Sequence, residues 1–228
     1  EFLLVKESIK KNIKDYRFDE AAKNAYQFVW HSFCDWYLEL SKTIYYSDNQ
    51  LSKNETRNVS AYIFREILIL LHPFIPFITE EVWLKNKLDK NNKDYLMFAN
   101  WSADKGKTDK SHIEVNKIIN FITSIRSFKN ELGIPPGSQI EISLEKTNNE
   151  LKNFFDKNNT VLTKLGRIKN ISLKDLTKSS ASLILDGELF KIYFEEDVDL
   201  NRVKDTLKKK LDKLNQEMGR INQRLANK

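Results

Sequence analysis

Hydrophobic residues recur at three- and four-residue steps through the first 134 residues, a spacing typical of amphipathic helices. The most aromatic of these patterns runs from Arg17 to about Tyr46 and contains neither Gly nor Pro. One apolar stripe along it is formed by Ala22, Ala25, Val29, Phe33, Trp36 and Leu40. Tyr26, Trp30 and Tyr37 widen that stripe. We therefore expect this helix to pack against more than one neighbour.

Residues that start or stop a helix divide the rest of this region. Starts are indicated by Ser52 with Glu55, by Thr79, and by Ser111 with Glu114, of which the first and last pairs form capping boxes. One helix is expected to stop before Pro73 and the last to be closed by Gly133. With a further amphipathic helix over residues 1–14, the pattern predicts a bundle of about five helices.

Beyond residue 134 the pattern changes to mixed strand and helix. Residues 139–145, QIEISLE, alternate as a β-strand does, and residues 147–150 carry a cap for a helix that ends near Gly166. Asp186-Gly187 is a two-residue turn between two apolar runs, which predicts a β-hairpin. We expect a small α+β subdomain here.

The last part of the chain is predicted to be one basic amphipathic helix. Its apolar positions are spaced 3-4-4-3-4-3-4 and comprise Leu200, Val203, Leu207, Leu211, Leu214, Met218, Ile221 and Leu225. The extra four-residue step departs from a strict heptad, so a locally unwound helix pair is expected rather than a long regular coiled coil. A chain that ends within such a seam is also expected to self-associate artificially.

The charge of the chain is concentrated in this helix. Residues 201–228 hold nine Lys and Arg against three Asp and Glu, which accounts for the whole formal net charge of +6. An excess of positive charge attracts a polyanion through counterion release, although a solvated helix face has the same composition.

Motifs in three parts of the chain resemble the anticodon-binding region of valyl-tRNA synthetases. FDEAAK (residues 18–23) and FCDWYLE (residues 33–39) are similar to the helix that opens that domain. LLHPFIPFITEEVW (residues 70–83) resembles a segment shared by the valyl, isoleucyl and leucyl enzymes, and RSFKNELGIPPG (residues 126–137) resembles the helix end and proline turn of the valyl family.

The resemblance implies a mainly α fold. It comprises a class Ia synthetase anticodon-binding helix bundle over residues 1–134, a small α+β subdomain over 135–197, and a truncated coiled-coil helix over 198–228. The α+β subdomain is expected either to act as a spacer or to contact RNA. The opening residues are already helical in pattern and lack Met, so we expect a piece of a longer protein.

The resemblance also implies a function, which is to bind the tRNA for valine within a parent ligase that attaches valine using ATP and magnesium. The sequence lacks the His-Ile-Gly-His and Lys-Met-Ser-Lys-Ser signatures of class I catalysis, so no catalytic residue and no cofactor are predicted within this chain. The parent is expected to be monomeric and cytoplasmic.

Two sets of residues are candidates for RNA contact. Unpaired anticodon bases stack on aromatic rings and Arg planes, and the motif that best matches the family supplies Arg17, Phe18, Phe33 and Trp36. The alternative for each aromatic is a place in the core. Phosphate contacts are expected from the basic residues of the last helix, Arg202, Lys204, Lys208, Lys209, Lys210, Lys213, Arg220 and Arg224.

Other classes of function are less well supported. The single cysteine, Cys34, excludes a disulfide framework and a Cys-rich zinc module, and no metal site is predicted. No apolar run reaches the roughly 20 residues that span a bilayer. An isoleucyl or leucyl anticodon domain remains an alternative, as does a helical scaffold whose last helix docks a protein partner and binds no RNA.

Overall fold

The computed structural model describes residues 1–88, 95–101, 111–144, 148–172, 180–185, 187–194 and 200–226. It divides into two compact units, Glu1–His112 and Ile113–Lys228. The sequence pattern placed a boundary at residue 134 instead. The structure groups the helix Ser111–Glu131 with the second unit because its Phe121 ring lies 5.3 Å from Phe155 and 5.7 Å from Phe190.

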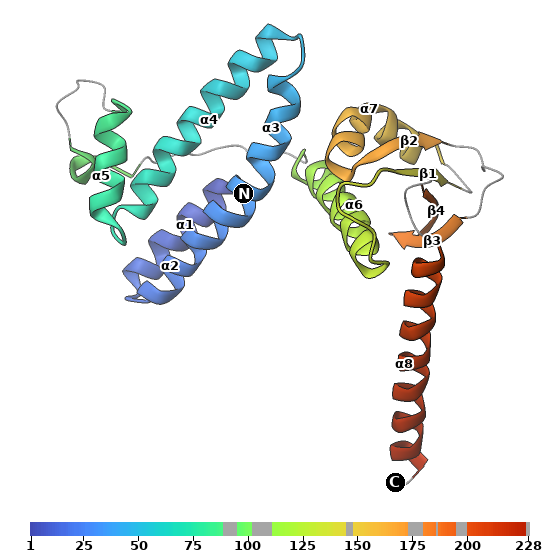
Figure 1. The fold of residues 1–228 in the computed structure, drawn as a ribbon. Helices are drawn as coiled ribbons and strands as arrows, with labels where there is room; N and C mark the ends of the chain where they lie inside the picture. The colour runs from blue at the N-terminus through green and yellow to red at the C-terminus, as the bar shows by residue number, and fades with distance from the viewer. Residues whose placement is uncertain are drawn as a thin grey trace. The chain divides into compact units, whose positions relative to one another are not determined.

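The first unit is entirely helical where it is described (Figure 1). Its elements are α1 (Phe2–Lys14), α2 (Phe18–Gln27), the π-helical segment η1 (Phe28–Tyr37), α3 (Leu38–Tyr45), α4 (Gln50–Leu71), α5 (Pro76–Lys85) and the 3₁₀ turn η2 (Leu96–Phe98). The core joins α1, α2, η1 and α4 through the buried residues Phe2, Ile9, Ala21, Ala25, Phe28, Phe33, Ile67 and Leu70.

The aromatic helix forms as predicted, but its wide π-helical turns change which residues are buried. A π-helix bonds residue i to i+5 and has more residues per turn than an α-helix, so its apolar positions recur at longer steps. The buried positions are accordingly Ala21, Ala25, Phe28 and Phe33, with a five-residue step between the last two. The expectation that Tyr26 and Trp30 pack against further neighbours is wrong, because both rings are more than half exposed.

A buried ion pair connects α1 to α4. The Lys6 ammonium lies 2.9 Å from a Glu66 carboxylate oxygen, and the two side chains are only 5% and 1% exposed. Arg65 also contacts the Glu66 carboxylate at 3.0 Å, from a more exposed position. This network fixes α1, and with it the turn that leads into α2, on the long helix α4.

Two of the predicted helix caps are wrong. Asn49, rather than Ser52, caps α4: its side chain accepts the backbone N–H of Ser52 at 3.0 Å. The next helix begins at Pro76, a residue well suited to the first turn because it has no N–H to leave unpaired. Thr79 therefore lies inside α5, where its hydroxyl meets His72 Nδ1 at 2.9 Å.

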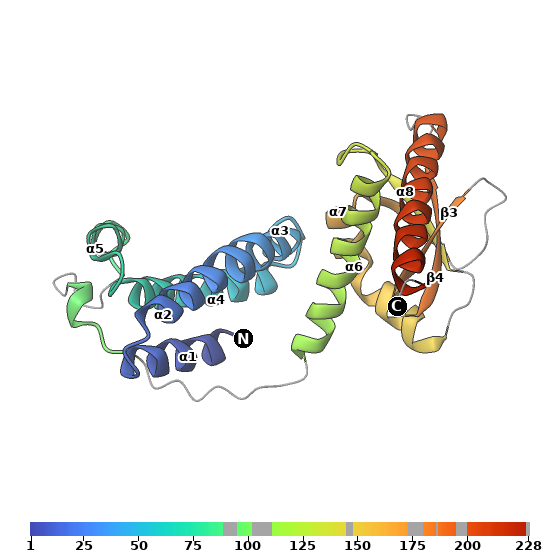
Figure 2. The same ribbon diagram turned by 90° about the horizontal axis from the view of Figure 1, so that it is seen from below.

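The second unit is a four-stranded sheet with helices packed on it (Figure 2). Its elements are α6 (Ser111–Glu131), β1 (Ile140–Leu144), α7 (Asn149–Gly166), β2 (Ile168–Ser172), β3 (Ser180–Leu185), β4 (Glu188–Phe194) and α8 (Leu200–Ala226). The strand order is β2-β1-β4-β3, with β1 and β2 parallel and the other pairs antiparallel. The hairpin is confirmed, whereas β2 was not predicted.

Helices α6 and α7 cover one face of this sheet. Phe121, Phe155 and Phe190 form a cluster of tilted rings between them and β4. Hydrogen bonds also join α6 to α7: the Glu114 carboxylate accepts from Lys157 at 2.6 Å and from Asn158 at 3.0 Å. These bonds hold the pKa of Glu114 below its usual range, the Asn158 bond contributing most.

Over its described side chains, helix α8 packs on the unit near its start. Val203 is buried against Leu132 and Ile134, and Lys210 pairs with Glu131. Further along, the predicted seam is exposed at Leu207, Leu211, Leu214, Met218, Ile221 and Leu225. The single helix is thus as predicted (Figure 1), and these exposed residues leave its apolar seam to solvent.

Candidate nucleic-acid interface

The turn between α1 and α2 presents aromatic rings to solvent. Tyr16 and Phe18 are 82% and 54% exposed, and their rings meet edge to face at 6.2 Å. Arg17 lies between them, exposed, as the residue that precedes the first turn of α2. We call residues 16–18 the aromatic turn.

The backbone of this turn is itself unusual. Tyr16 has a φ of 57°, in the left-handed region that bulky residues rarely adopt. Strained positions of this kind concentrate at functional sites, where the surrounding structure holds them. Here the conformation places the Tyr16 ring against the exposed Phe18 ring rather than into the core.

The charge around the aromatic turn is mixed. Lys11 and Lys14 end α1, whereas Asp19 and Glu20 begin α2, and Glu20 lies 3.8 Å from Arg17. Carboxylates at a helix N-terminus are stabilised by the helix dipole. Because cations and carboxylates balance here, stacking on rings and on the guanidinium plane is what this surface offers, more than attraction of phosphate.

The structure separates the four residues predicted for anticodon contact. Arg17 and Phe18 lie together and exposed on the aromatic turn. Phe33 is only 7% exposed and stacks on Tyr37 in the core at 5.4 Å, so it cannot accept a base without loss of that packing. Its assignment as an RNA contact is corrected to a core residue. Trp36 is half-buried.

A second exposed aromatic pair was missed by the sequence analysis. The Tyr26 and Trp30 rings are nearly parallel, at an interplanar angle of 5° and 6.2 Å between centroids. Both belong to the helix that the aromatic turn begins, one α-helical turn apart. The spacing alone assigned them to a widened core stripe, and their exposure in the structure shows that they face outward.

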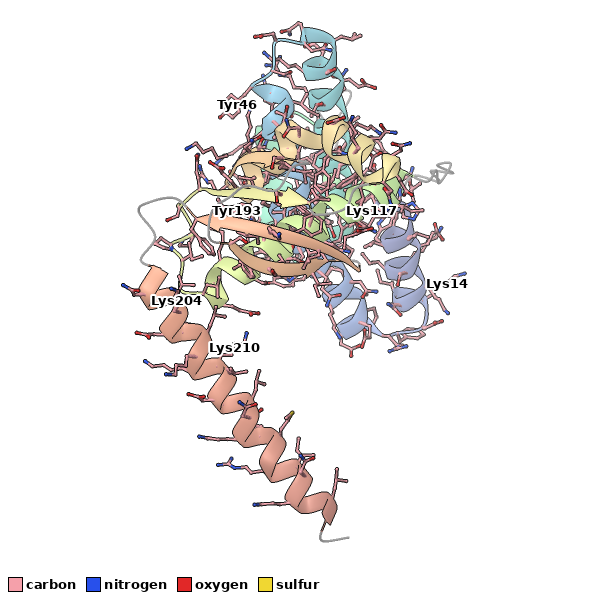
Figure 3. The ribbon with its side chains drawn as sticks, turned by 90° about the vertical axis from the view of Figure 1, so that its right-hand side faces the viewer. Lys14, Tyr46, Lys117, Tyr193, Lys204 and Lys210 are labelled. Atoms are coloured by element: carbon pink, nitrogen blue, oxygen red, sulfur yellow. The ribbon has the colours of Figure 1, made fainter. Side chains whose placement is uncertain are left out.

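The basic residues of α8 are exposed where they are described. These are Lys204, Lys208, Lys209, Lys210, Lys213 and Arg220, while the side chains of Arg202 and Arg224 lie outside the described part. Figure 3 shows Lys204 and Lys210 on this helix. Lys210 pairs with Glu131, an exposed contact of the kind that contributes roughly 0–1 kcal/mol. The helix can therefore offer ammonium groups to a polyanion.

The described residues also bear on metal ligation and on membrane spanning. Among its described residues, no three His, Cys, Asp or Glu side chains are grouped so as to hold a metal ion. Cys34 is half-buried in η1. Of the described helices, none is long and apolar enough to cross a membrane.

Comparison with known proteins identifies relatives over the whole chain. The family model for the anticodon-binding domain of tRNA ligase matches residues 1–144. The chain is 57% identical over its full length to a valine--tRNA ligase of Pelagibacter ubique, covering 26% of that protein. It is 34% identical over 96% of its length to the enzyme of Rhizobium meliloti and 32% identical over 96% to that of Mesorhizobium japonicum. The chain thus spans about a quarter of the length of the curated relatives it matches.

Proposed function

Because the chain belongs to the family of anticodon-binding domains of tRNA ligases, we propose that it binds the tRNA for valine as part of a valine--tRNA ligase. The observation that carries this proposal is the aromatic turn, which lies inside the matched region and exposes two rings and a guanidinium. Such groups are what splayed, unpaired RNA bases stack on.

The aromatic turn supplies the proposed base contacts. Phe18 and Arg17 carry the stacking, and the exposed Tyr26 and Trp30 pair extends it along the same helix. Stacking of one base on an aromatic side chain contributes about 1–3 kcal/mol. Trp36, half-buried, is kept as a proposed contact, whereas Phe33 is not part of the proposal.

The α8 lysines supply the proposed phosphate contacts, which position RNA without reading its sequence. The logarithm of affinity falls as the logarithm of salt concentration rises, and each neutralised phosphate makes this slope steeper by up to about 0.9. Removal of residues 204–228 should therefore flatten the salt dependence of tRNA binding. An unchanged affinity and slope would exclude α8 as an RNA contact.

The parent ligase would attach valine to its tRNA with ATP and magnesium, in the cytoplasm and as a monomer. No step of that reaction is assigned to this chain. Its contribution is to hold the tRNA, and the valine relatives favour this specificity over the isoleucyl and leucyl alternatives.

The proposal is tested by substituting single residues of the aromatic turn. Phe18→Ala and Arg17→Ala should each weaken binding of the tRNA for valine by about 1–3 kcal/mol. Tyr46→Ala is the matched control, because Tyr46 is equally an exposed ring of the first unit, beyond the end of α3 (Figure 3). Equal binding by all three variants and the unaltered chain would overturn the aromatic turn as the base contact.

One observation favours a second candidate, a helical scaffold. The exposed apolar seam of α8 is suited to pack on another helix. If docking of a protein partner were the function, the chain would show no affinity for tRNA and would self-associate in sedimentation experiments through this seam.

A further inference from the structure

The second unit contains a cationic pocket where the end of α6 meets the junction of α7 and β2. Its volume is about 470 Å³, and its lining includes Arg126, Lys129, Asn130 and Arg167. Arg126, Lys129 and Arg167 are the cationic residues of the described lining, which includes no Asp or Glu. A concave surface of one sign concentrates the field of its charges and attracts an ion of the opposite sign.

Lys129 provides a positive charge in the lining of this pocket. Among the residues that the structure describes, it is one of the few charged side chains that are buried, at 3% exposure. The ammonium donates to the carbonyl oxygens of Pro136, at 3.3 Å, and Ser138. These two bonds hold the ammonium in the lining of the pocket.

Arg126 contributes a directed donor from α6. Its Nη2 donates to the Leu165 carbonyl at 3.1 Å, at the last turn of α7. A guanidinium carries five N–H groups in a planar fork, so one such group can bridge a carbonyl and an anionic oxygen. The bond also covers a carbonyl at the negative end of the α7 dipole, which would otherwise repel an anion.

Arg167 has the most informative conformation in the pocket. It follows the end of α7 with φ 53° and ψ 50°, a left-handed position that helices usually fill with Gly or Asn. The glycine of this helix end is one residue earlier: a Cβ on Gly166 would lie 2.7 Å from the Ile168 side chain. Close packing thus accounts for Gly166, whereas packing does not account for an arginine at position 167, which is exposed.

Another pocket of this unit makes a contrast. It lies over the phenylalanine cluster, and its lining has Glu150 and Glu188 beside Lys117. Lys117 and Glu150 pair at 3.3 Å, so that pocket has no net positive field to offer an anion. The cationic pocket is therefore the better anion site of the two.

We infer that the cationic pocket binds a phosphodiester group of the tRNA, with Arg167 and Arg126 as donors and Lys129 as a fixed charge. The inference rests on the proposed function, because the tRNA that the pocket would bind is the ligand of that function. It assigns direct RNA contact to the α+β unit, which is then more than a spacer between the helical bundle and α8.

Arg167→Gly tests this inference, because it removes the charge while relieving the backbone. The full chain and the variant are titrated with the tRNA for valine over a range of salt concentrations. Loss of one phosphate contact should reduce the salt slope by about 0.9 and the affinity by about eightfold at 0.1 M salt. The midpoint of thermal unfolding should stay the same or rise, because Gly suits the left-handed position.

Two further variants control for charge and place. Arg167→Lys keeps a positive charge and should retain most of the affinity, so a loss as large as that of Arg167→Gly would overturn the inference. Lys152→Ala removes an exposed charge from the same helix, α7, outside the pocket, and should change the slope much less.

The outcomes separate the inference from the function on which it rests. If the unaltered chain binds the tRNA and Arg167→Gly binds equally well with the same slope, the pocket is not a phosphate site and the proposed function stands. If the unaltered chain has no affinity for tRNA, the proposed function fails and the inference fails with it.

Discussion

Replacing Lys6 by Met should strongly destabilise the first unit. The substitution keeps most of the side-chain volume but leaves the Glu66 carboxylate buried at 1% exposure without its partner at 2.9 Å. Breaking one partner out of a buried ion pair typically costs about 3–5 kcal/mol. Arg65 still contacts Glu66 at 3.0 Å, so we expect the lower end, about 3 kcal/mol.

The assay is equilibrium unfolding in urea, monitored by tryptophan fluorescence and circular dichroism. The double variant Lys6→Met with Glu66→Leu should recover much of the loss, because an apolar pair of similar volume often replaces a buried ion pair without destabilisation. A loss below about 1 kcal/mol for Lys6→Met would show that this pair behaves as an exposed one, and would refute the packing of α1 on α4.

Two more predictions concern the core of the first unit and the hydrogen bonds between α6 and α7. Phe33→Ala should lower the free energy of unfolding by about 3–5 kcal/mol, as for a buried aromatic, whereas Phe18→Ala should change it by no more than about 0.5 kcal/mol, as for a surface residue, in the same urea experiment. Comparable losses would contradict the assignment of Phe33 to the core. The pKa of Glu114 is lowered by Asn158 and Lys157, so its stabilising contribution is present above the ordinary pKa of a glutamate and is lost as the pH falls through the lowered value. An NMR titration should show the pKa of Glu114 rising in Lys157→Ala, and an unchanged pKa would contradict a contribution from the Lys157 ammonium.

Periodic segments were predictable from the sequence, and the reasons for the failures are physical. Helices α1, α4, α6 and α8 and the β-hairpin follow directly from their hydrophobic spacing. The π-helical segment was not predictable in this way, because its residues keep a pattern that an α-helix also fits. Strand β2 is short, with two exposed polar residues at its centre, so it lacks the alternation that indicates a strand.

The candidate site was predictable only as a region. The motif around Phe18 led to the helix that the aromatic turn begins, but the sequence does not show that Phe18 is exposed and Phe33 is buried. The buried pair of Lys6 with Glu66 and the cationic pocket join residues far apart in the chain. No spacing rule brings Arg126 and Arg167 together before the fold is known.

We propose above that this chain recognises the tRNA for valine by binding the anticodon end of that RNA. The most direct test is titration of the chain with that tRNA, with the same tRNA carrying a substituted anticodon, and with an unrelated tRNA, at two salt concentrations. We predict preferential binding of the intact tRNA for valine, with the preference preserved at the higher salt concentration. Equal, salt-sensitive binding of all three RNAs would contradict the claim and leave only the electrostatics of the lysine-rich helix, and no binding would favour the scaffold.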